Sequence, residues 1–408
     1  MKEIITIQAG QCGNQISSTF WDHLNVEHKN LEGNHAKFFY ESLNGLTNRA
    51  ILLDSEPRAI EQIFNGNFSE ENVLISEEKI GSGNNWAIGR ETASKMENKI
   101  KDLIQRELEA CESLEGFNLM HSTAGGTGSG FSSFLVKILK ENYAKKIIST
   151  ISVLPSNEIS ETVVQPYNSV LNLAAILESD NPILVDNSSL FRIGADSNDF
   201  SNANFLLGSA IASYTRPLRF PSFMFSDLSE ISSALNIGRL NLKTFSCNFK
   251  NKRKTKSFEI LKKLQNRNNL FADFSTSTEN NLCTKNEIIS CINFVFNTKN
   301  EDLRKSNLEF FEKGQSQFVK WMPPSYFSLG LEYENELNPF DAVGITNSTG
   351  ITNLISNVCN QFDKLKKRGA FLDVYRKYDE NLEELENSRI KLQKIVEEYE
   401  NASKTFAD

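Results

Sequence analysis

Ala124-Gly125-Gly126-Thr127-Gly128-Ser129-Gly130 is the most informative segment of this chain. It lies between an apolar segment with the pattern of a β-strand, residues 117–121, and a segment with helical spacing of apolar residues, 131–139. A strand that turns on glycines into a helix directs backbone N–H groups and the positive end of the helix dipole at one point. Only glycine lets the backbone approach a ligand so closely. The stretch therefore predicts an anion site of the kind that holds phosphate.

This loop differs from a Walker-type loop, because it contains no Gly-Lys-Ser or Gly-Lys-Thr. Backbone amides and a metal ion, rather than a lysine, would have to neutralise the phosphates. The alternative interpretation is a flexible glycine linker. Linkers are not usually enclosed between a strand and an apolar helix, so we favour the phosphate loop.

The bulk composition limits the class of protein. The 408 residues suggest two or three domains, and the net charge of −8 argues against a dedicated nucleic-acid binder. The six cysteines form no C-x-x-C pair, which favours a reducing cytosol, and the four histidines lack zinc-binding spacing. We expect no signal peptide and no membrane span, because no apolar run approaches about 18 residues.

Strand and helix patterns alternate through the first ~185 residues, which predicts a mostly parallel sheet covered on both faces. The expected strands are residues 3–8, 49–54, 117–121, 147–154 and 182–187. The expected helices include residues 12–27, 94–109 and 131–143. Ligands of such sheets bind beyond the carboxyl ends of the strands.

The sequence patterns divide the whole chain into four parts. We place a first domain at residues 1–199, a long connecting helix at 200–220, a mixed α+β domain at 221–345 and C-terminal helices at 346–408. The mixed domain is expected to hold short strands at 240–245, 288–296 and 326–331 and a helix at 258–266.

Three further segments are expected to meet the phosphate loop at the same sheet edge. Residues 10–15 follow the first strand and bring more amides, although strand-to-helix turns often carry glycine. Residues 54–57, Asp-Ser-Glu-Pro, follow the second strand, where a carboxylate can hold Mg²⁺ or simply cap a helix. Residues 81–87 form a glycine and amide loop that touches the terminal phosphate or is a plain surface turn.

Several stretches, in this order, resemble the tubulin family along nearly the whole chain: the first twenty residues, 56–57, 83–87, 124–130, 163–168 and 218–221. The resemblance implies an α/β fold with a mostly parallel GTP-binding domain, a central connecting helix, a smaller mixed α+β domain and a C-terminal helical hairpin. It also implies GTP or GDP as ligand, with Mg²⁺.

The resemblance implies a set of phosphate and metal residues. Gln11 and Glu56 would lie near the magnesium ion, and Asn85 would approach the γ-phosphate. The remaining residues on the phosphate side are Gly10, Cys12, Gln15, Ser122, Ala124, Gly125, Gly126, Thr127 and Gly128.

The resemblance also implies contacts to the nucleoside. Glu161 falls where the family contacts the ribose, and Asn14, Asn187 and Asn204 fall at guanine-reading positions. An Asn side chain offers both a donor and an acceptor, which suits the edge of guanine. Phe200 would stack on the base, although without the resemblance a core position is the simpler interpretation.

Within the family the details resemble gamma-tubulin. Ala124 opens the phosphate loop where the alpha and beta classes usually have Gly, and the matching stretches are 70–77, 113–117, 252–255, 318–321 and 361–372. The chain also ends without the long glutamate-rich tail usual in those two classes. It is, however, short for the family and divergent, with losses in the second domain.

Glu230 is the one candidate for a catalytic role. In alpha-tubulin a Glu at the matching place helps to hydrolyse the GTP of the next subunit, and gamma-tubulins usually lack it. Here Glu230 is present, but Phe225 stands where an Asn is expected. We favour a surface acid over an activating residue.

The resemblance leads us to expect a GTP-binding nucleator of microtubules in the cytoplasmic cytoskeleton, at organising centres such as spindle poles or the centrosome. The expected partners are alpha/beta-tubulin, ring-complex scaffold proteins and lateral copies of the chain itself, with neither nucleic acid nor membrane. GTP hydrolysis by the lone subunit should be weak. The alternatives are a divergent beta-type lattice subunit, a soluble GTPase switch and a bacterial-type filament protein.

Overall fold

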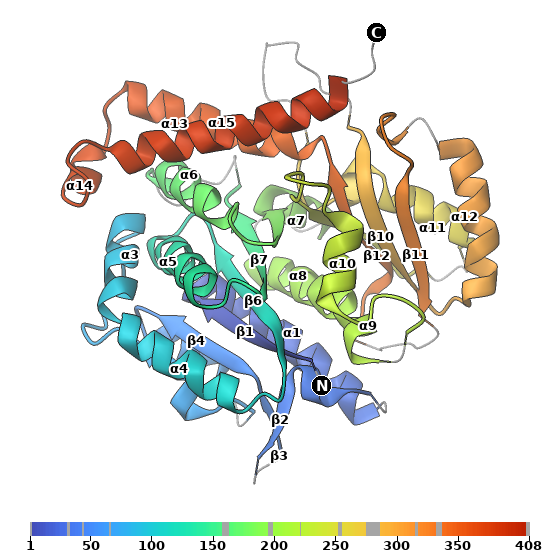
Figure 1. The fold of residues 1–408 in the computed structure, drawn as a ribbon, viewed down its shortest axis with the longest axis horizontal. Helices are drawn as coiled ribbons and strands as arrows, with labels where there is room; N and C mark the ends of the chain where they lie inside the picture. Colours follow the sequence, from blue (N-terminus) through green and yellow to red (C-terminus); the bar gives the residue numbers. More distant parts are fainter. Residues whose placement is uncertain are drawn as a thin grey trace. The chain divides into compact units, whose positions relative to one another are not determined.

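A six-stranded parallel sheet organises the first part of the chain (Figure 1). Its strand order is β5-β4-β1-β6-β7-β8. The strands are β1 (Glu3–Ala9), β4 (Ala50–Asp54), β5 (Val73–Ile75), β6 (Leu114–Ser122), β7 (Ile147–Leu154) and β8 (Asn181–Asp186). All seven residues of β1 are buried, as expected for a strand covered on both faces. The fold class predicted from the sequence is confirmed.

This computed structural model describes residues 2–30, 33–42, 45–64, 67–156, 163–194, 199–220, 222–251, 255–274, 286–314, 317–331 and 337–404. The chain forms two compact units. The first comprises residues 1–18, 34–182 and 358–394, and the second comprises 19–33, 183–357 and 395–408. Three helices therefore pass from one unit to the other: α1 (Gly10–Asn30), α13 (Ile351–Lys367) and α15 (Glu383–Lys404).

The other elements of the first unit are short helices, a small hairpin and the segments that flank the sheet. The helices are α2 (Arg58–Ile63), α3 (Trp86–Lys95), α4 (Glu97–Glu109), α5 (Gly126–Asn142), α6 (Gln165–Ile176) and α14 (Leu372–Arg376). The hairpin pairs β2 (Phe39–Ser42) with β3 (Gly45–Asn48), and the 3-10 turns are η1 (His35–Lys37) and η2 (Glu70–Asn72).

The second unit is built on a four-stranded sheet of order β11-β10-β12-β9. Its strands are β9 (Thr244–Phe249), β10 (Ile288–Phe296), β11 (Ser325–Leu331) and β12 (Phe340–Ser348). Its helices are α7 (Asn187–Ile193), α8 (Phe200–Tyr214), α9 (Arg216–Arg219), α10 (Leu228–Leu235), α11 (Ser257–Leu264), α12 (Asn300–Gly314) and the 3-10 turn η3 (Arg267–Asn269).

The structure differs from the sequence expectations at several elements, and the short strands β2, β3 and β5 are among those that were not expected. The strand expected at 240–245 lies at Thr244–Phe249, and the helix expected at 94–109 is two helices that meet at Met96. Neither α12 nor β12 was expected, because the former is largely polar and the latter carries Gly344 and Asn347 within its apolar run.

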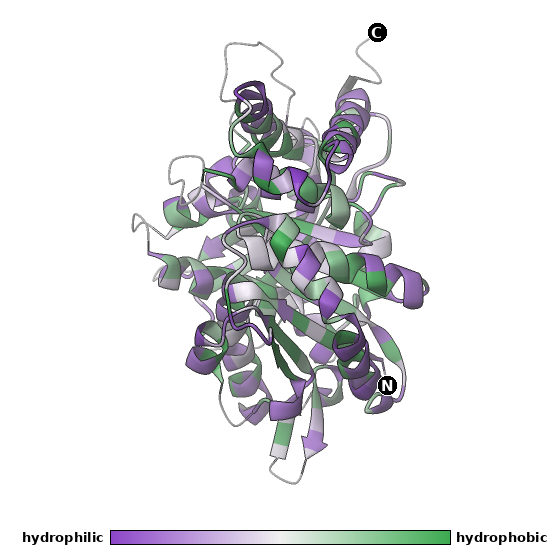
Figure 2. Ribbon diagram, turned by 90° about the vertical axis from the view of Figure 1, so that its left-hand side faces the viewer, coloured by the Kyte–Doolittle hydropathy of each residue, from purple (hydrophilic) through white to green (hydrophobic). Residues whose placement is uncertain are grey.

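Hydrophobic and hydrophilic residues separate as a folded core requires. Figure 2 shows green strands in the interior, whereas the helices carry both green and purple residues along their length. Within the described ranges, no helix has the length and apolar character needed to cross a membrane.

A buried ion pair joins η1 to β6 in the first unit. Lys37 Nζ is 2.8 Å from Glu115 Oε2, and the two side chains are only 4% and 5% exposed. Charges taken out of water are tolerated when they are paired, so each depends on the other.

Replacing Lys37 with Met should destabilise the protein by about 3–5 kcal/mol, because the change leaves a buried carboxylate without its cation. Urea unfolding measures the loss, and adding Glu115→Leu should restore most of it. The matched control is Arg106→Met, since Arg106 and its partner Glu71 are 48% and 73% exposed; this change should cost less than about 1 kcal/mol. Equal losses from both single variants would contradict the prediction.

Candidate nucleotide-binding site

The glycine stretch that follows β6 forms the first turn of helix α5. Gly125 is the N-cap residue, with extended backbone, and the helix begins at Gly126. The first helical hydrogen bond runs from Ser129 N–H to Gly125 C=O at 3.2 Å. The N–H groups of Gly126, Thr127 and Gly128 lie before that bond and thus have no partner within the helix. The stretch therefore has the backbone of an anion site, at the carboxyl end of β6.

Hydroxyl groups tie three loops together at this sheet edge. Thr127 Oγ1 lies 2.7 Å from Ser55 Oγ, in the loop after β4, and 3.0 Å from Ser82 Oγ, in the loop before α3. The predicted convergence of residues 54–57, 81–87 and 124–130 is therefore present. Sequence reasoning did not single out Ser55 and Ser82, although both stand inside the loops that it did identify.

The turn between β1 and α1 lies against the same helix start. Gly10 has a φ of +73°, and a Cβ there would lie 2.8 Å from Gly128 N. A side chain at position 10 would thus collide with the phosphate loop. Gln11 and Cys12 follow in the first turn of α1, with Gln11 exposed and Cys12 half-buried. The turn brings these predicted residues to the loop of Gly128.

Asn14 and Asn85 each form side-chain hydrogen bonds to the backbone of the site, which leave part of each carboxamide over. Asn14 Nδ2 donates to Gly10 C=O at 3.0 Å and to Leu53 C=O at 3.4 Å. Asn85 is the N-cap of α3, and its Oδ1 accepts from Ala87 N–H at 2.7 Å. The Nδ2 group of Asn85 remains for a ligand, since it donates to no other residue that the structure describes.

Asp54 is a buried carboxylate at the end of β4. Its Oδ1 accepts from Ser55 N–H at 2.7 Å, while its buried Oδ2 accepts no hydrogen bond from any described residue. Burial raises the pKa of Asp54 to about 6 and the nearby Glu56 charge adds to the rise, against the lowering effects of the Ser55 and Glu56 amides and of the Asn14 side chain. A buried carboxylate oxygen without a donor is suited to a cation.

Asp54 and the exposed Glu56 fit a magnesium ion. Mg²⁺ prefers oxygen ligands and is typically held by one or two carboxylates together with phosphate oxygens. Glu56 lies against Gly81, the first residue of the loop before α3. These two carboxylates would hold the ion, which would offset phosphate charge that no cationic side chain of the loops neutralises. The assignment of Gln11 to the metal stays a prediction.

Apart from Asn14, which is in the first unit, the predicted nucleoside residues that the structure describes lie in the second unit. Phe200 and Asn204 are one turn apart on α8, and Phe200 is 41% exposed with its edge toward Phe191. Asn187 begins α7, whose N-cap Asp186 accepts from Ser188 N–H at 3.2 Å. The exposure of Phe200 argues against a core position. Glu161, predicted at the ribose, lies outside the described residues.

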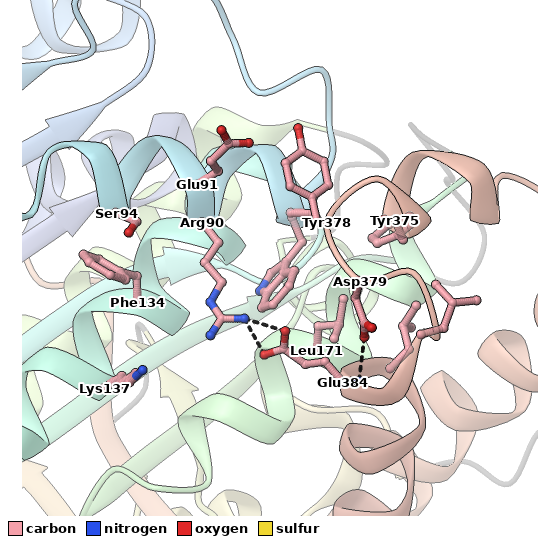
Figure 3. A pocket seen from close by; sticks show the side chains of 14 residues that line it. Arg90, Glu91, Ser94, Phe134, Lys137, Leu171, Tyr375, Tyr378, Asp379 and Glu384 are labelled. Carbon is pink, nitrogen blue, oxygen red and sulfur yellow. Dashed lines mark hydrogen bonds and ion pairs between the residues drawn. The ribbon is translucent and has the colours of Figure 1, made fainter.

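A separate pocket of about 330 Å³ adjoins the start of α3 in the first unit (Figure 3). Its walls come from α3, α5, α6, α14 and α15. Figure 3 shows the Arg90 guanidinium directed at the Glu384 carboxylate, with which it forms a two-pronged ion pair. The same guanidinium lies 4.9 Å from the centre of the Trp86 ring. The start of α15 is therefore fastened to α3.

Asp54→Asn should stabilise the nucleotide-free protein at pH 8, by roughly 1–3 kcal/mol, while weakening Mg²⁺-dependent nucleotide binding. A folded pKa raised above its unfolded value of 3.8 means that the charged carboxylate opposes folding at high pH. The difference in melting temperature should therefore shrink as the pH falls from 6 to 4, and wild-type Mg²⁺ affinity should fall over the same range.

Thermal unfolding and Mg²⁺ titration at pH values from roughly 4 to 8 provide these measurements. Asp102→Asn, on the exposed face of α4, is the control and should change neither quantity. If Asp54→Asn were less stable than the wild-type protein at pH 8, the assignment of Asp54 as a buried carboxylate that awaits a metal ion would be contradicted.

The comparison with known families agrees with this geometry. Residues 3–195 match the model of the Tubulin/FtsZ family, GTPase domain. The match spans β1 to α7 and so contains every loop that converges on the start of α5. The match places the amide-lined loop after β6 inside a Tubulin/FtsZ-type GTPase domain that covers residues 3–195.

Proposed function

We propose that this chain is a gamma-type tubulin that nucleates microtubules at organising centres. The proposal rests on the stretch 361–372, which is the longest of those that resemble gamma-tubulin. It folds as the end of α13 and the turn into α14. Lys364, Lys366 and Lys367 lie in the last turn of α13, and Phe371, with a φ of +61°, is 52% exposed.

An exposed phenylalanine beside a basic helix end is a surface suited to a protein partner. In the proposed function the partners are alpha/beta-tubulin, ring-complex scaffold proteins and lateral copies of this chain. A preformed ring lowers the entropic cost of the first encounters between tubulin dimers, because the subunits are already held at high local concentration. The role proposed for bound GTP is to keep the nucleotide-bearing face in a form that accepts a tubulin dimer.

The residues of the site are suited to binding phosphate rather than to cleaving it. Residues 10–15, 54–57, 81–87 and 124–130 contain neither lysine nor arginine. Glu230, in the second unit, is exposed and accepts a hydrogen bond from Ser226 N–H at 2.9 Å. This bond lies across the start of its own helix, which supports the surface-acid interpretation. We infer that hydrolysis needs a group from a neighbouring subunit.

The isolated subunit should therefore turn over GTP slowly, well below the ~1–100 s⁻¹ of enzymes built for phosphoryl transfer. Release of inorganic phosphate from a monomeric, purified sample measures this rate. Glu230→Gln should leave it unchanged, because the residue acts on no nucleotide of its own subunit. Rapid turnover by the monomer would instead favour the soluble GTPase switch.

Small amounts of the chain should increase the number of microtubules formed from alpha/beta-tubulin and shorten the lag of assembly. Fluorescently labelled chain should mark one end of each microtubule. Phe371→Asn, which suits the left-handed backbone, should reduce the number of microtubules at unchanged GTP affinity. Ile390→Asn is the matched control, since Ile390 is also 52% exposed but lies on α15. Label along the whole microtubule would replace the proposal with a beta-type lattice subunit.

A further inference from the structure

Asn168 lies at the centre of a hydrogen-bond network beneath the phosphate loop. It is fully buried on α6. Its Nδ2 donates to the carbonyl oxygens of Asn84 and Ala124, both at 2.7 Å. Its Oδ1 accepts from Trp86 N–H at 2.9 Å and from Tyr375 O–H at 2.7 Å. A carboxamide has two donors and two acceptor sites, so every hydrogen-bonding group of this side chain is used.

We propose that Asn168 is a positioning residue for nucleotide, which fixes the two loops of the phosphate site against each other and links both to α14. The inference rests on the GTP binding assigned above. Sequence reasoning noted residue 168 only within the stretch 163–168 that resembles the family, because nothing local to α6 shows which loops its side chain reaches.

The bond to Ala124 determines where the next amide points. In a trans peptide the C=O of one residue and the N–H of the next are directed oppositely. Asn168 holds the Ala124 oxygen in the interior, so the Gly125 N–H is directed outward. A Cβ on Gly125 would meet no atom within 4 Å, so the space around this residue is open. The Gly125 N–H is therefore directed away from Asn168 at the start of α5.

The hydrogen bonds between Asn168 and the loop before α3 likewise fix the backbone of that loop. Gly83 and Asn84 have φ values of +53° and +54°, a conformation that costs energy for Asn84. Asn168 accepts from Trp86 N–H and donates to Asn84 C=O, so it holds both sides of Asn85. Asn85 is the residue expected at the terminal phosphate. Loss of these bonds would release that loop without disturbing the sheet.

Tyr375 carries the network to the C-terminal segment of the same unit. Its ring packs against Tyr167, with ring centres 5.3 Å apart, and Tyr167 O–H donates to Ala370 C=O at 3.0 Å. Neighbouring residues of α6 thus hold both ends of the segment 370–375, which includes the exposed Phe371. A partner that moves this segment would act on the phosphate loops through one hydrogen bond, and linkage requires the reverse as well.

The matched pair Tyr375→Phe and Tyr167→Phe tests the proposal, because each removes one hydroxyl hydrogen bond to the segment 370–375 and keeps the ring. Titration calorimetry on the full chain gives the affinities for GTP and GDP. Tyr375→Phe should weaken GTP binding about three- to tenfold and GDP binding less. Tyr167→Phe should change the GTP affinity less than about twofold, at a similar loss of melting temperature.

Asn168→Asp is the stronger variant, since it keeps the shape but loses both donors. It should weaken GTP binding at least about tenfold and lower the ratio of GTP to GDP affinity. If it does not fold, the tyrosine pair alone decides. Equal effects of the two tyrosine variants on GTP would overturn the proposal. Failure of the wild-type chain to bind GTP would instead overturn the assigned ligand, so the two failures are distinguishable.

Discussion

The whole nucleotide site depends on the close approach of backbone segments at the start of α5. A Cβ on Gly10 would collide with Gly128, and a Cβ on Gly130 would collide with the backbone of α3 near Arg90. Side chains at these positions would separate the β1–α1 turn, α3 and α5, and the amides would no longer face one point. The glycines are therefore required by packing between elements as well as by the ligand.

The charges of the site, in contrast, destabilise the protein when no nucleotide is bound. The loops bring no cationic side chain, and they bury Asp54 with one oxygen that no described donor satisfies. This burial destabilises the folded protein, and a bound magnesium nucleotide would offset the loss, since a ligand that prefers the folded state stabilises it. The apo protein is thus held in a strained electrostatic state that makes binding more favourable, at the expense of its own stability.

The sequence was most informative where the chemistry is local. Alternating patterns and the glycine stretch predicted that the loops at 54–57, 81–87 and 124–130 meet at one sheet edge, and the structure brings them together there. The start of α5 at Gly126 was missed, since glycines are poor helix formers and only packing against α3 stabilises them there. The bridge of Thr127 to Ser55 and Ser82 and the bonds of Asn168 join residues far apart in the chain, which no local pattern encodes.

The recognised GTPase domain ends near residue 195, but the compact unit that contains it also includes residues 358–394. Tyr167, Trp86 and Arg90 make their contacts with that distant part of the chain. A fragment truncated after the match would expose aromatic rings to water and leave an arginine without its counter-ion. A gene fusion or deletion that separates these two stretches would therefore unfold part of this unit, even though its motif-bearing portion survives intact.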